Sequence, residues 1–155
     1  MRLALSLLFV LLIASVAIST TTTQGPRVGN IKDSRIADGC GCYFQFPGSK
    51  RNSEKYMFFS SVEERPEKEA WMNIDGQDVK LKLTSKTDPK GREKVGSRSS
   101  RTYTAEGIRL DVTYVATRVC GVNEESCEST DYNATFKLMV RGVPRTIKAV
   151  GGCGC

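Results

Sequence analysis

The tetrapeptide Gly-Cys-Gly-Cys occurs twice in this chain, at residues 39–42 and again at residues 152–155, and no other feature restricts the fold as strongly. Residues two apart in an extended strand point to one face, so each copy presents two sulfur atoms on the same side. If the two copies pair as antiparallel strands, one register sets Cys42 opposite Cys153 and Cys40 opposite Cys155. Opposed residues in such a ladder lie about 4.5 Å apart, within disulfide range. The repeat therefore predicts two disulfides, in this pairing or a crossed version of it, that join the first and last strands.

The other two cysteines, Cys120 and Cys127, flank a short acidic segment and are expected to form a third disulfide. A second interpretation makes the repeats a site for a soft metal ion, since four thiolates suit Zn²⁺ or Cu(I), or a redox-active centre. Export to an oxidising compartment and the close Cys-x-Cys spacing favour disulfides over metal. The ligands in the metal alternative would be Cys40, Cys42, Cys153 and Cys155.

The N-terminus has the pattern of an exported protein. Arg2 is the only charged residue before an apolar run over residues 3–18, and Ser15-Val16-Ala17 supplies the small residues that a signal peptidase reads. The apolar run is short for a membrane span, which needs about 20 residues. We therefore predict a signal peptide over residues 1–17, a secreted or periplasmic protein, and no membrane contact apart from the signal peptide.

The rest of the chain divides into two parts. Residues 18–37 are polar, with four consecutive threonines and no apolar period, and predict a flexible lead-in. Residues 38–155 predict a single all-β domain, because apolar and polar side chains alternate with a period of two. The strands expected from this alternation and from the turns between them cover residues 42–46, 56–62, 70–74, 79–84, 108–116, 132–141 and 145–150.

Turn residues favour hairpins between these strands. Asp75-Gly76 separates two apolar segments, and Asp-Gly favours the type I′ turn that matches the twist of paired strands. Gly142-Val143-Pro144 is expected to close a second hairpin near the C-terminus. The predicted fold is a small antiparallel β-barrel or sandwich of about seven or eight strands, stapled by disulfides.

The residue composition excludes the commonest catalytic machinery. The chain has no histidine, so Ser-His-Asp and Cys-His arrangements and histidine metal sites are all impossible. The carboxylates fall in charged runs, where they are usually exposed and have ordinary acidity, so paired-carboxylate chemistry has little support. We therefore expect a protein that is not an enzyme and that needs no cofactor.

Charge is distributed unevenly along the chain, whose net charge is +6. Residues 86–101 carry six basic and two acidic side chains and predict a basic loop, whereas residues 121–133 carry four acidic side chains and no basic one. A basic loop steers toward an acidic protein or an anionic cell-surface polymer. Nucleic acid is not expected, because Tyr103 is the only stacking group near the loop and the protein is exported.

Residues 70–120 resemble the bacterial C-type lysozyme inhibitors in the order of their elements: a hairpin at Ile74-Asp75-Gly76, a strand around Leu81, a Ser-rich loop at 97–103 and a strand that runs to Cys120. Members of that family are small exported β-barrels whose loop inserts into the lysozyme cleft. The resemblance implies a contact surface formed by Ser97, Ser99, Ser100, Arg101 and Tyr103.

Together these patterns predict a secreted, non-catalytic binding or inhibitor module of the cell envelope, directed at a lysozyme-like or other envelope partner. Two alternatives stay open at this point. One is the metal-binding or redox protein built on the two Gly-Cys-Gly-Cys segments. The other is a structural envelope protein.

Overall fold

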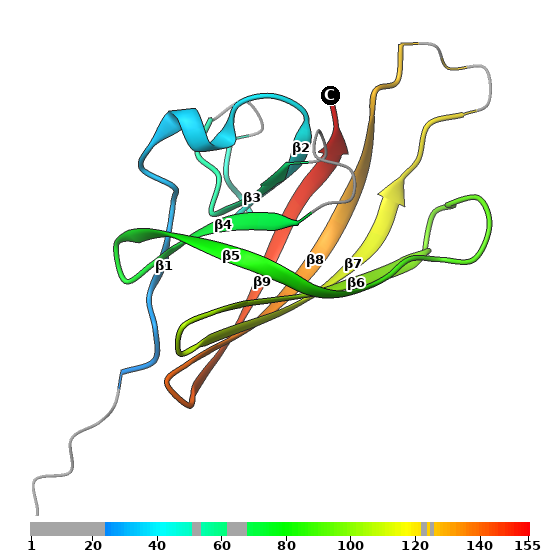
Figure 1. Cartoon of the computed structure of the whole chain (residues 1–155). Coiled ribbons are helices and arrows are strands. Elements are labelled where there is room, and N and C mark those ends of the chain that lie inside the picture. The colour runs from blue at the N-terminus through cyan, green and yellow to red at the C-terminus, as the bar shows by residue number, and fades with distance from the viewer. Residues whose placement is uncertain (1–23, 51–53, 62–67, 122–123, 125) are drawn as a thin grey trace, which may run out of the picture.

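The computed structural model describes residues 24–50, 54–61, 68–121, 124 and 126–155, which form nine strands and one short 3-10 helix (Figure 1). The predicted signal peptide, residues 1–17, lies outside the described residues. None of the described segments is a helix with the length and apolarity needed to cross a membrane. The elements are β1 (Val28–Gly29), η1 (Ser34–Ala37), β2 (Gly41–Gln45), β3 (Phe58–Ser61), β4 (Glu69–Ile74), β5 (Gln77–Thr87), β6 (Arg98–Ala105), β7 (Ile108–Arg118), β8 (Ser129–Val140) and β9 (Val143–Gly154).

Strands β2 to β9 form a closed antiparallel barrel of eight strands. The ladder runs β4-β3-β2-β9-β8-β7-β6-β5, and a pairing of β4 with β5 closes the ring. Strand β1 is additional and pairs with β4, where Val28 lies opposite Ile74. The predicted all-β, disulfide-stapled fold is confirmed, and the barrel is the form that the structure adopts.

The alternation of residue types places the core inside the barrel. In β7, Leu110, Val112 and Tyr114 are buried while the residues between them are more exposed, and β8 repeats the pattern around Phe136. An eight-stranded barrel has an interior that side chains can just fill, and here aromatic rings fill much of it. The ring of Phe58 lies 5.0 Å from that of Phe136, in an edge-on contact.

Two predicted hairpins are present at one end of the barrel. Asp75 and Gly76 have φ values of 50° and 81°, the left-handed pair that a type I′ turn requires. The second hairpin is turned by Arg141 and Gly142, with φ values of 48° and 83°, because Val143 is already the first residue of β9. The turn is therefore one residue earlier than the sequence indicated.

The lead-in predicted for residues 18–37 is not flexible where the structure describes it. Arg27 and Asp75 hold each other by two hydrogen bonds of 2.7 Å, from the Arg27 N–H to the carboxylate and from the Asp75 N–H to the Arg27 carbonyl. Further along, the Asp78 carboxylate accepts hydrogen bonds from the backbone N–H groups of Lys32 and Asp33, at 2.9 and 3.0 Å. A two-residue strand has no period for sequence analysis to detect, so the sequence did not indicate that residues 24–37 pack against the barrel.

The stretch expected as a basic loop, residues 86–101, is a loop in its central part, and only its two ends are strand. Strand β5 continues to Thr87 and β6 begins at Arg98, so the connection between them is limited to residues 88–97. Apolar alternation is absent from the sequence here because β6 carries small polar side chains and Arg101, with Tyr103 its only fully buried residue. Residues 88–97 are called the β5–β6 loop below.

Candidate functional site

All three disulfides lie at the end of the barrel opposite the hairpins. Cys42–Cys153 and Cys40–Cys155 join the start of β2 to the end of β9, in the register that the sequence predicts, so that pairing is confirmed. Cys120–Cys127 closes the connection between β7 and β8. The C-terminus, this connection and the β5–β6 loop share that end (Figure 1). The three bonds therefore fix the strand ends that surround one opening of the barrel.

Glycines beside the cysteines allow β2, β8 and β9 to approach one another closely. A Cβ atom on Gly151 would collide with the backbone oxygen of Tyr43, and one on Gly154 would collide with that of Glu128. Gly152 is less crowded, since its Cβ would lie 3.0 Å from the Thr130 oxygen. Gly151 and Gly154 thus permit the strand contacts that bring the sulfur atoms together.

A cavity of about 310 Å³ lies inside this end of the barrel, beneath the β5–β6 loop. The Cys42–Cys153 disulfide forms part of its wall, together with the buried rings of Tyr114 and Tyr132. The remaining wall is polar, which is unusual for a barrel interior. Its charged and hydroxyl side chains are Asp88, Glu93, Ser99 and Arg101.

Two polar contacts connect the loop to the barrel interior. The Arg101 guanidinium, only 15% exposed, pairs with the Asp88 carboxylate at 2.7 Å. The Tyr132 hydroxyl donates a hydrogen bond of 2.9 Å to Glu93. Burial raises the pKa of Tyr132, and the bond to the Glu93 carboxylate raises it further, so the hydroxyl stays protonated and continues to donate. The first half of the loop is thus held over the cavity.

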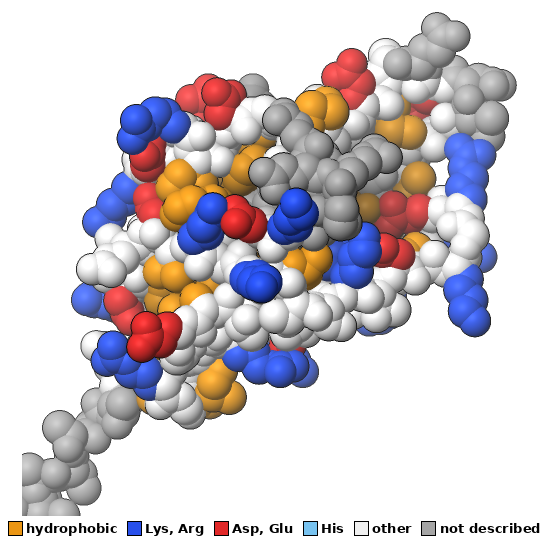
Figure 2. All heavy atoms as spheres, in the orientation of Figure 1, with side chains coloured by type: hydrophobic (Ala, Val, Ile, Leu, Met, Phe, Trp, Pro, Cys, Tyr) orange, Lys and Arg blue, Asp and Glu red, His pale blue; other side chains and the backbone are white. Residues whose placement is uncertain are grey.

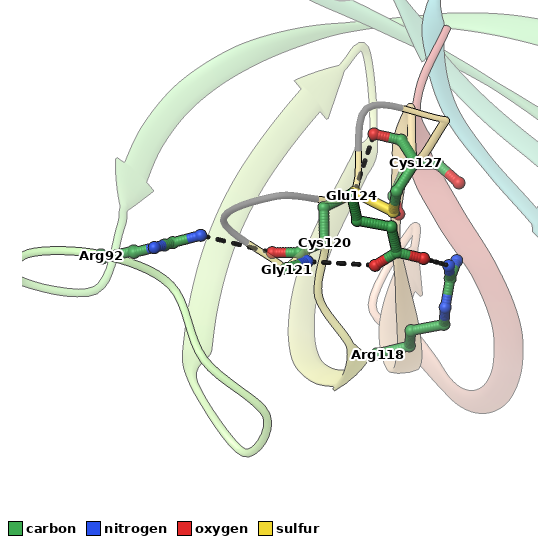
Figure 3. The surroundings of a disulfide bond; sticks show 7 residues. Arg92, Arg118, Cys120, Gly121, Glu124 and Cys127 are labelled. Carbon is green, nitrogen blue, oxygen red and sulfur yellow. Dashed lines mark hydrogen bonds and ion pairs between the residues drawn. A yellow bond between two sulfur atoms is a disulfide. The ribbon is translucent and has the colours of Figure 1, made fainter.

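The basic and acidic segments predicted from the sequence lie side by side (Figure 3). The Arg92 side chain extends toward the carbonyl of Cys120, at 3.4 Å. Across the Cys120–Cys127 loop, the Glu124 carboxylate accepts from the Gly121 N–H at 3.1 Å and pairs with Arg118 at 2.8 Å. The Gly121 hydrogen bond is the main reason that the pKa of Glu124 is lowered, and Arg118 adds to it against the opposing effect of burial. The Glu124 contacts with Gly121 and Arg118 thus stabilise the short disulfide loop.

The second half of the β5–β6 loop projects into solvent. Val95 is 65% exposed, the largest value among the large apolar side chains of the described residues. Backbone hydrogen bonds fix the base of the loop, with the Gly96 N–H donating to Ala116 at 2.8 Å and the Ala116 N–H donating to Ser97 at 3.0 Å. In Figure 2, Lys and Arg side chains line the edge of the molecule where Figure 1 places this loop. The exposed cations of the loop and its exit are Lys90, Arg92, Lys94 and Arg98.

The structure separates the five residues predicted as a contact surface. Ser99 and Arg101 line the cavity, and the Ser97 hydroxyl accepts a hydrogen bond from the Lys94 N–H at 3.0 Å. Ser100 is half-buried on β6. Tyr103 is fully buried and its ring packs 5.7 Å from that of Phe58, so its inclusion in the contact surface is wrong. The alternation that turns Arg101 inward turns Tyr103 inward as well, one pair of residues deeper in the barrel.

The exposure of Val95 was missed by the sequence analysis. The signal was present in the sequence, because Lys94-Val95-Gly96 sets one apolar residue against a cation and a glycine within the basic segment. Only the structure shows that this residue lacks a place in the core.

The sulfur atoms of the metal alternative are bonded to one another in the structure, as Cys40–Cys155 and Cys42–Cys153. A metal site at these residues would need both disulfides reduced, since the thiolate is the ligand. Among the described residues, no group of three or more histidine, cysteine or acidic side chains is gathered in a way that would hold an ion.

These features define a class of protein: a disulfide-closed, eight-stranded antiparallel barrel with three two-residue hairpins at one end and the disulfides around a polar cavity at the other. No family model, no curated protein and no solved structure matches the chain. A functional argument therefore depends on the geometry of the disulfide end.

Proposed function

We propose that this protein is an exported, non-catalytic binding module of the inhibitor type, and that the tip of the β5–β6 loop docks into an acidic site of its partner. The observation that carries the proposal is the 65% exposure of Val95 on a fixed loop that also displays Lys90, Arg92 and Lys94. Export is supported by the signal-peptide pattern and by three disulfides.

An apolar side chain surrounded by charges is a common composition for a docking site. The apolar group supplies contact area that loses water on binding, and the surrounding cations steer an acidic partner and set the orientation. A loop whose base is already ordered loses less conformational entropy when it binds. The hydrogen bonds between Gly96, Ser97 and Ala116 supply that order, as does the contact of Arg92 with Cys120.

A C-type lysozyme is the partner that the sequence resemblance suggests. Its cleft carries two carboxyl groups, a general acid and an ionised carboxylate, that flank the bond to be cleaved. The cations at the loop tip complement such a cleft, whereas the five residues that the resemblance implied are largely turned into the barrel. The proposed contact surface is therefore Lys90, Arg92, Lys94, Val95 and Arg98.

The test is inhibition of lysozyme by the purified, disulfide-bonded protein. We expect hydrolysis to fall on titration, with weaker inhibition at high salt because exposed charges are screened. The double substitution Lys94→Glu with Val95→Asp should weaken inhibition by about tenfold or more. A matched control is Lys137→Glu with Met139→Asp, an exposed cation and an exposed apolar residue on the outer face of β8.

A lack of inhibition at micromolar excess would exclude lysozyme. Salt-sensitive retention on an anionic polysaccharide, lost in the Lys94/Val95 variant and kept in the Lys137/Met139 variant, would then identify a cell-surface polymer as the partner. If neither partner responds to the loop variant, the docking proposal itself is wrong.

A further inference from the structure

We propose that the cavity beneath the β5–β6 loop binds a small zwitterion of the α-amino acid class. In this arrangement the ligand carboxylate binds the Arg101 guanidinium, its ammonium binds Glu93 and Asp88, and its side chain lies against the Cys42–Cys153 disulfide and the tyrosine rings. The site is distinct from the proposed docking surface, because it uses the inner side of the loop and the docking surface uses the outer tip.

The size of the cavity limits the ligand to a small molecule. Its volume of about 310 Å³ is at the lower end of the range of roughly 300 to 1,000 Å³ found for ligand pockets. Barrels of eight strands either fill with side chains or hold one small ligand. This barrel does both, since aromatic rings fill its middle and the disulfide end is left hollow.

The charges of the cavity select for a ligand that carries both signs. Arg101 supplies a cation that is 15% exposed, and Asp88 and Glu93 supply two carboxylates in the same small space. A simple anion that approaches Arg101 also meets the two carboxylates, and a simple cation that approaches them also meets Arg101. A zwitterion satisfies both sets at once, and the charge balance of the half-buried site stays unchanged.

The two carboxylates have the acceptor capacity that such a ligand needs. The Arg101 guanidinium already donates to Asp88 and to the Ser100 and Thr87 carbonyls, so the ligand carboxylate shares it with them. Glu93 accepts one hydrogen bond from the Tyr132 hydroxyl through Oε2, and an ionised carboxylate has about four acceptor positions. Asp88 is 48% exposed, so part of its carboxylate faces the opening. An ammonium group beside these carboxylates also lies near the rings of Tyr114 and Tyr132, whose faces attract cations.

Three separate attachment points also predict a preference for one enantiomer. The carboxylate, the ammonium and the side chain of the ligand each contact a different part of the wall. Inverting the configuration at the α carbon of the ligand moves one of these groups away from the part of the wall that it contacts. We therefore expect the L and D forms of the same amino acid to differ in affinity.

The experiment is isothermal titration of the disulfide-bonded protein with the common α-amino acids in both L and D forms. Each ligand that binds is compared with its two single-charge analogues, which for valine are 3-methylbutanoate and isobutylamine. We expect at least one amino acid to bind. Both analogues should bind with an affinity lower by about tenfold or more, because each makes only one of the two sets of charged contacts.

Two variants test the assigned residues. Glu93→Gln retains an acceptor for the Tyr132 hydroxyl but removes the negative charge, and Arg101→Gln removes the cation; each should reduce the affinity about tenfold or more. Lys137→Gln, on the outer face of β8 and away from the cavity, should leave it unchanged. Unfolding curves of each variant show whether the barrel is intact, and Glu93→Gln decides the question if Arg101→Gln fails to fold.

The proposal is overturned by any of three results: no amino acid binds at millimolar concentration, single-charge analogues bind as well as the zwitterion, or Lys137→Gln weakens binding as much as Glu93→Gln. The first result would leave Asp88, Glu93 and Arg101 with the purely structural role of holding the loop down.

Discussion

The two ends of this barrel are built in different ways. At the hairpin end, β4 and β5, β6 and β7, and β8 and β9 are each joined by two residues, with Gly76, Gly107 and Gly142 at positive φ. At the disulfide end, longer connections link the strands, and three disulfides hold the strand ends and one of those connections. Among the described strands, the connection between β2 and β3 is the one longer loop on the hairpin side, whereas the disulfide end carries the polar cavity and the exposed basic loop.

The difference shows where covalent bonds are needed in a small barrel. A two-residue turn sets the register of its hairpin by local geometry alone. The contact between β2 and β9 instead joins segments more than 100 residues apart, and the charged cavity beside it provides little apolar contact to hold them. The disulfides supply the closure there, so the disulfide end can carry polar groups that a purely apolar core would exclude.

The largest loss of stability is expected from removing the two disulfides that join β2 to β9. Replacing Cys40, Cys42, Cys153 and Cys155 by serine should lower the free energy of unfolding by about 4 to 5 kcal/mol, the chain-entropy value for a closed loop of this length. Replacing only the outer pair, Cys40 and Cys155, should cost about 2 kcal/mol or less, because Cys42–Cys153 still closes the long loop. Urea unfolding measures both, and equal losses would contradict this account of the disulfide end.

A smaller loss of stability is expected when a glycine beside the disulfides is replaced by alanine. Gly151→Ala places a methyl group against the Tyr43 backbone oxygen, which cannot move without disturbing the ladder between β2 and β9. We expect a loss of about 1 to 3 kcal/mol, as for other overpacked sites. Gly152→Ala is the matched control, since its nearest contact of 3.0 Å needs only a small shift. If thermal unfolding shows that Gly152→Ala is less stable than Gly151→Ala, the close approach of β2 and β9 at Gly151 is contradicted.

At the hairpin end a substitution acts only on its own turn. Gly76→Ala forces a side chain into a φ of 81° and should cost about 1 to 2 kcal/mol. Gly76→Asn should retain more stability, because asparagine adopts left-handed conformations more readily than alanine. Chemical unfolding of the two variants gives the comparison. A loss at Gly76 larger than that of the four-cysteine variant would reverse the contrast between the ends.

The smallest change in stability is expected from Asp78, which binds the N-terminal segment beside the hairpin end. Burial acts to raise the pKa of Asp78, but hydrogen bonds from Asn73 and from the Asp33 and Lys32 backbone lower it below its ordinary value of 3.8. A carboxyl with a depressed pKa in the folded state stabilises the fold above its unfolded pKa, and this contribution is lost as the pH falls through the folded value. Between pH 5 and pH 2, wild type should therefore lose more stability than Asp78→Asn. Parallel profiles for the two proteins would contradict this role.

The sequence alone determined the features that depend on local chemistry and on the period of a strand. The alternation of apolar residues predicted the strands that form most of the barrel, and Asp75-Gly76 predicted its hairpin. The Cys-x-Cys spacing predicted the partners of four cysteines, because one antiparallel register satisfies both pairs. Each of these inferences needs only neighbours along the chain or one pairing of two segments.

Tertiary structure decided the rest, because those features depend on which segments meet when the barrel closes. Whether an inward-facing residue of β6 meets the core or the cavity depends on its depth in the barrel, so Tyr103 is buried while Arg101 lines a charged wall. The docking of Arg27 on Asp75 and the contact of Arg92 with Cys120 join residues 48 and 28 positions apart. No period or turn motif encodes such distances, and only the closed barrel brings these groups together.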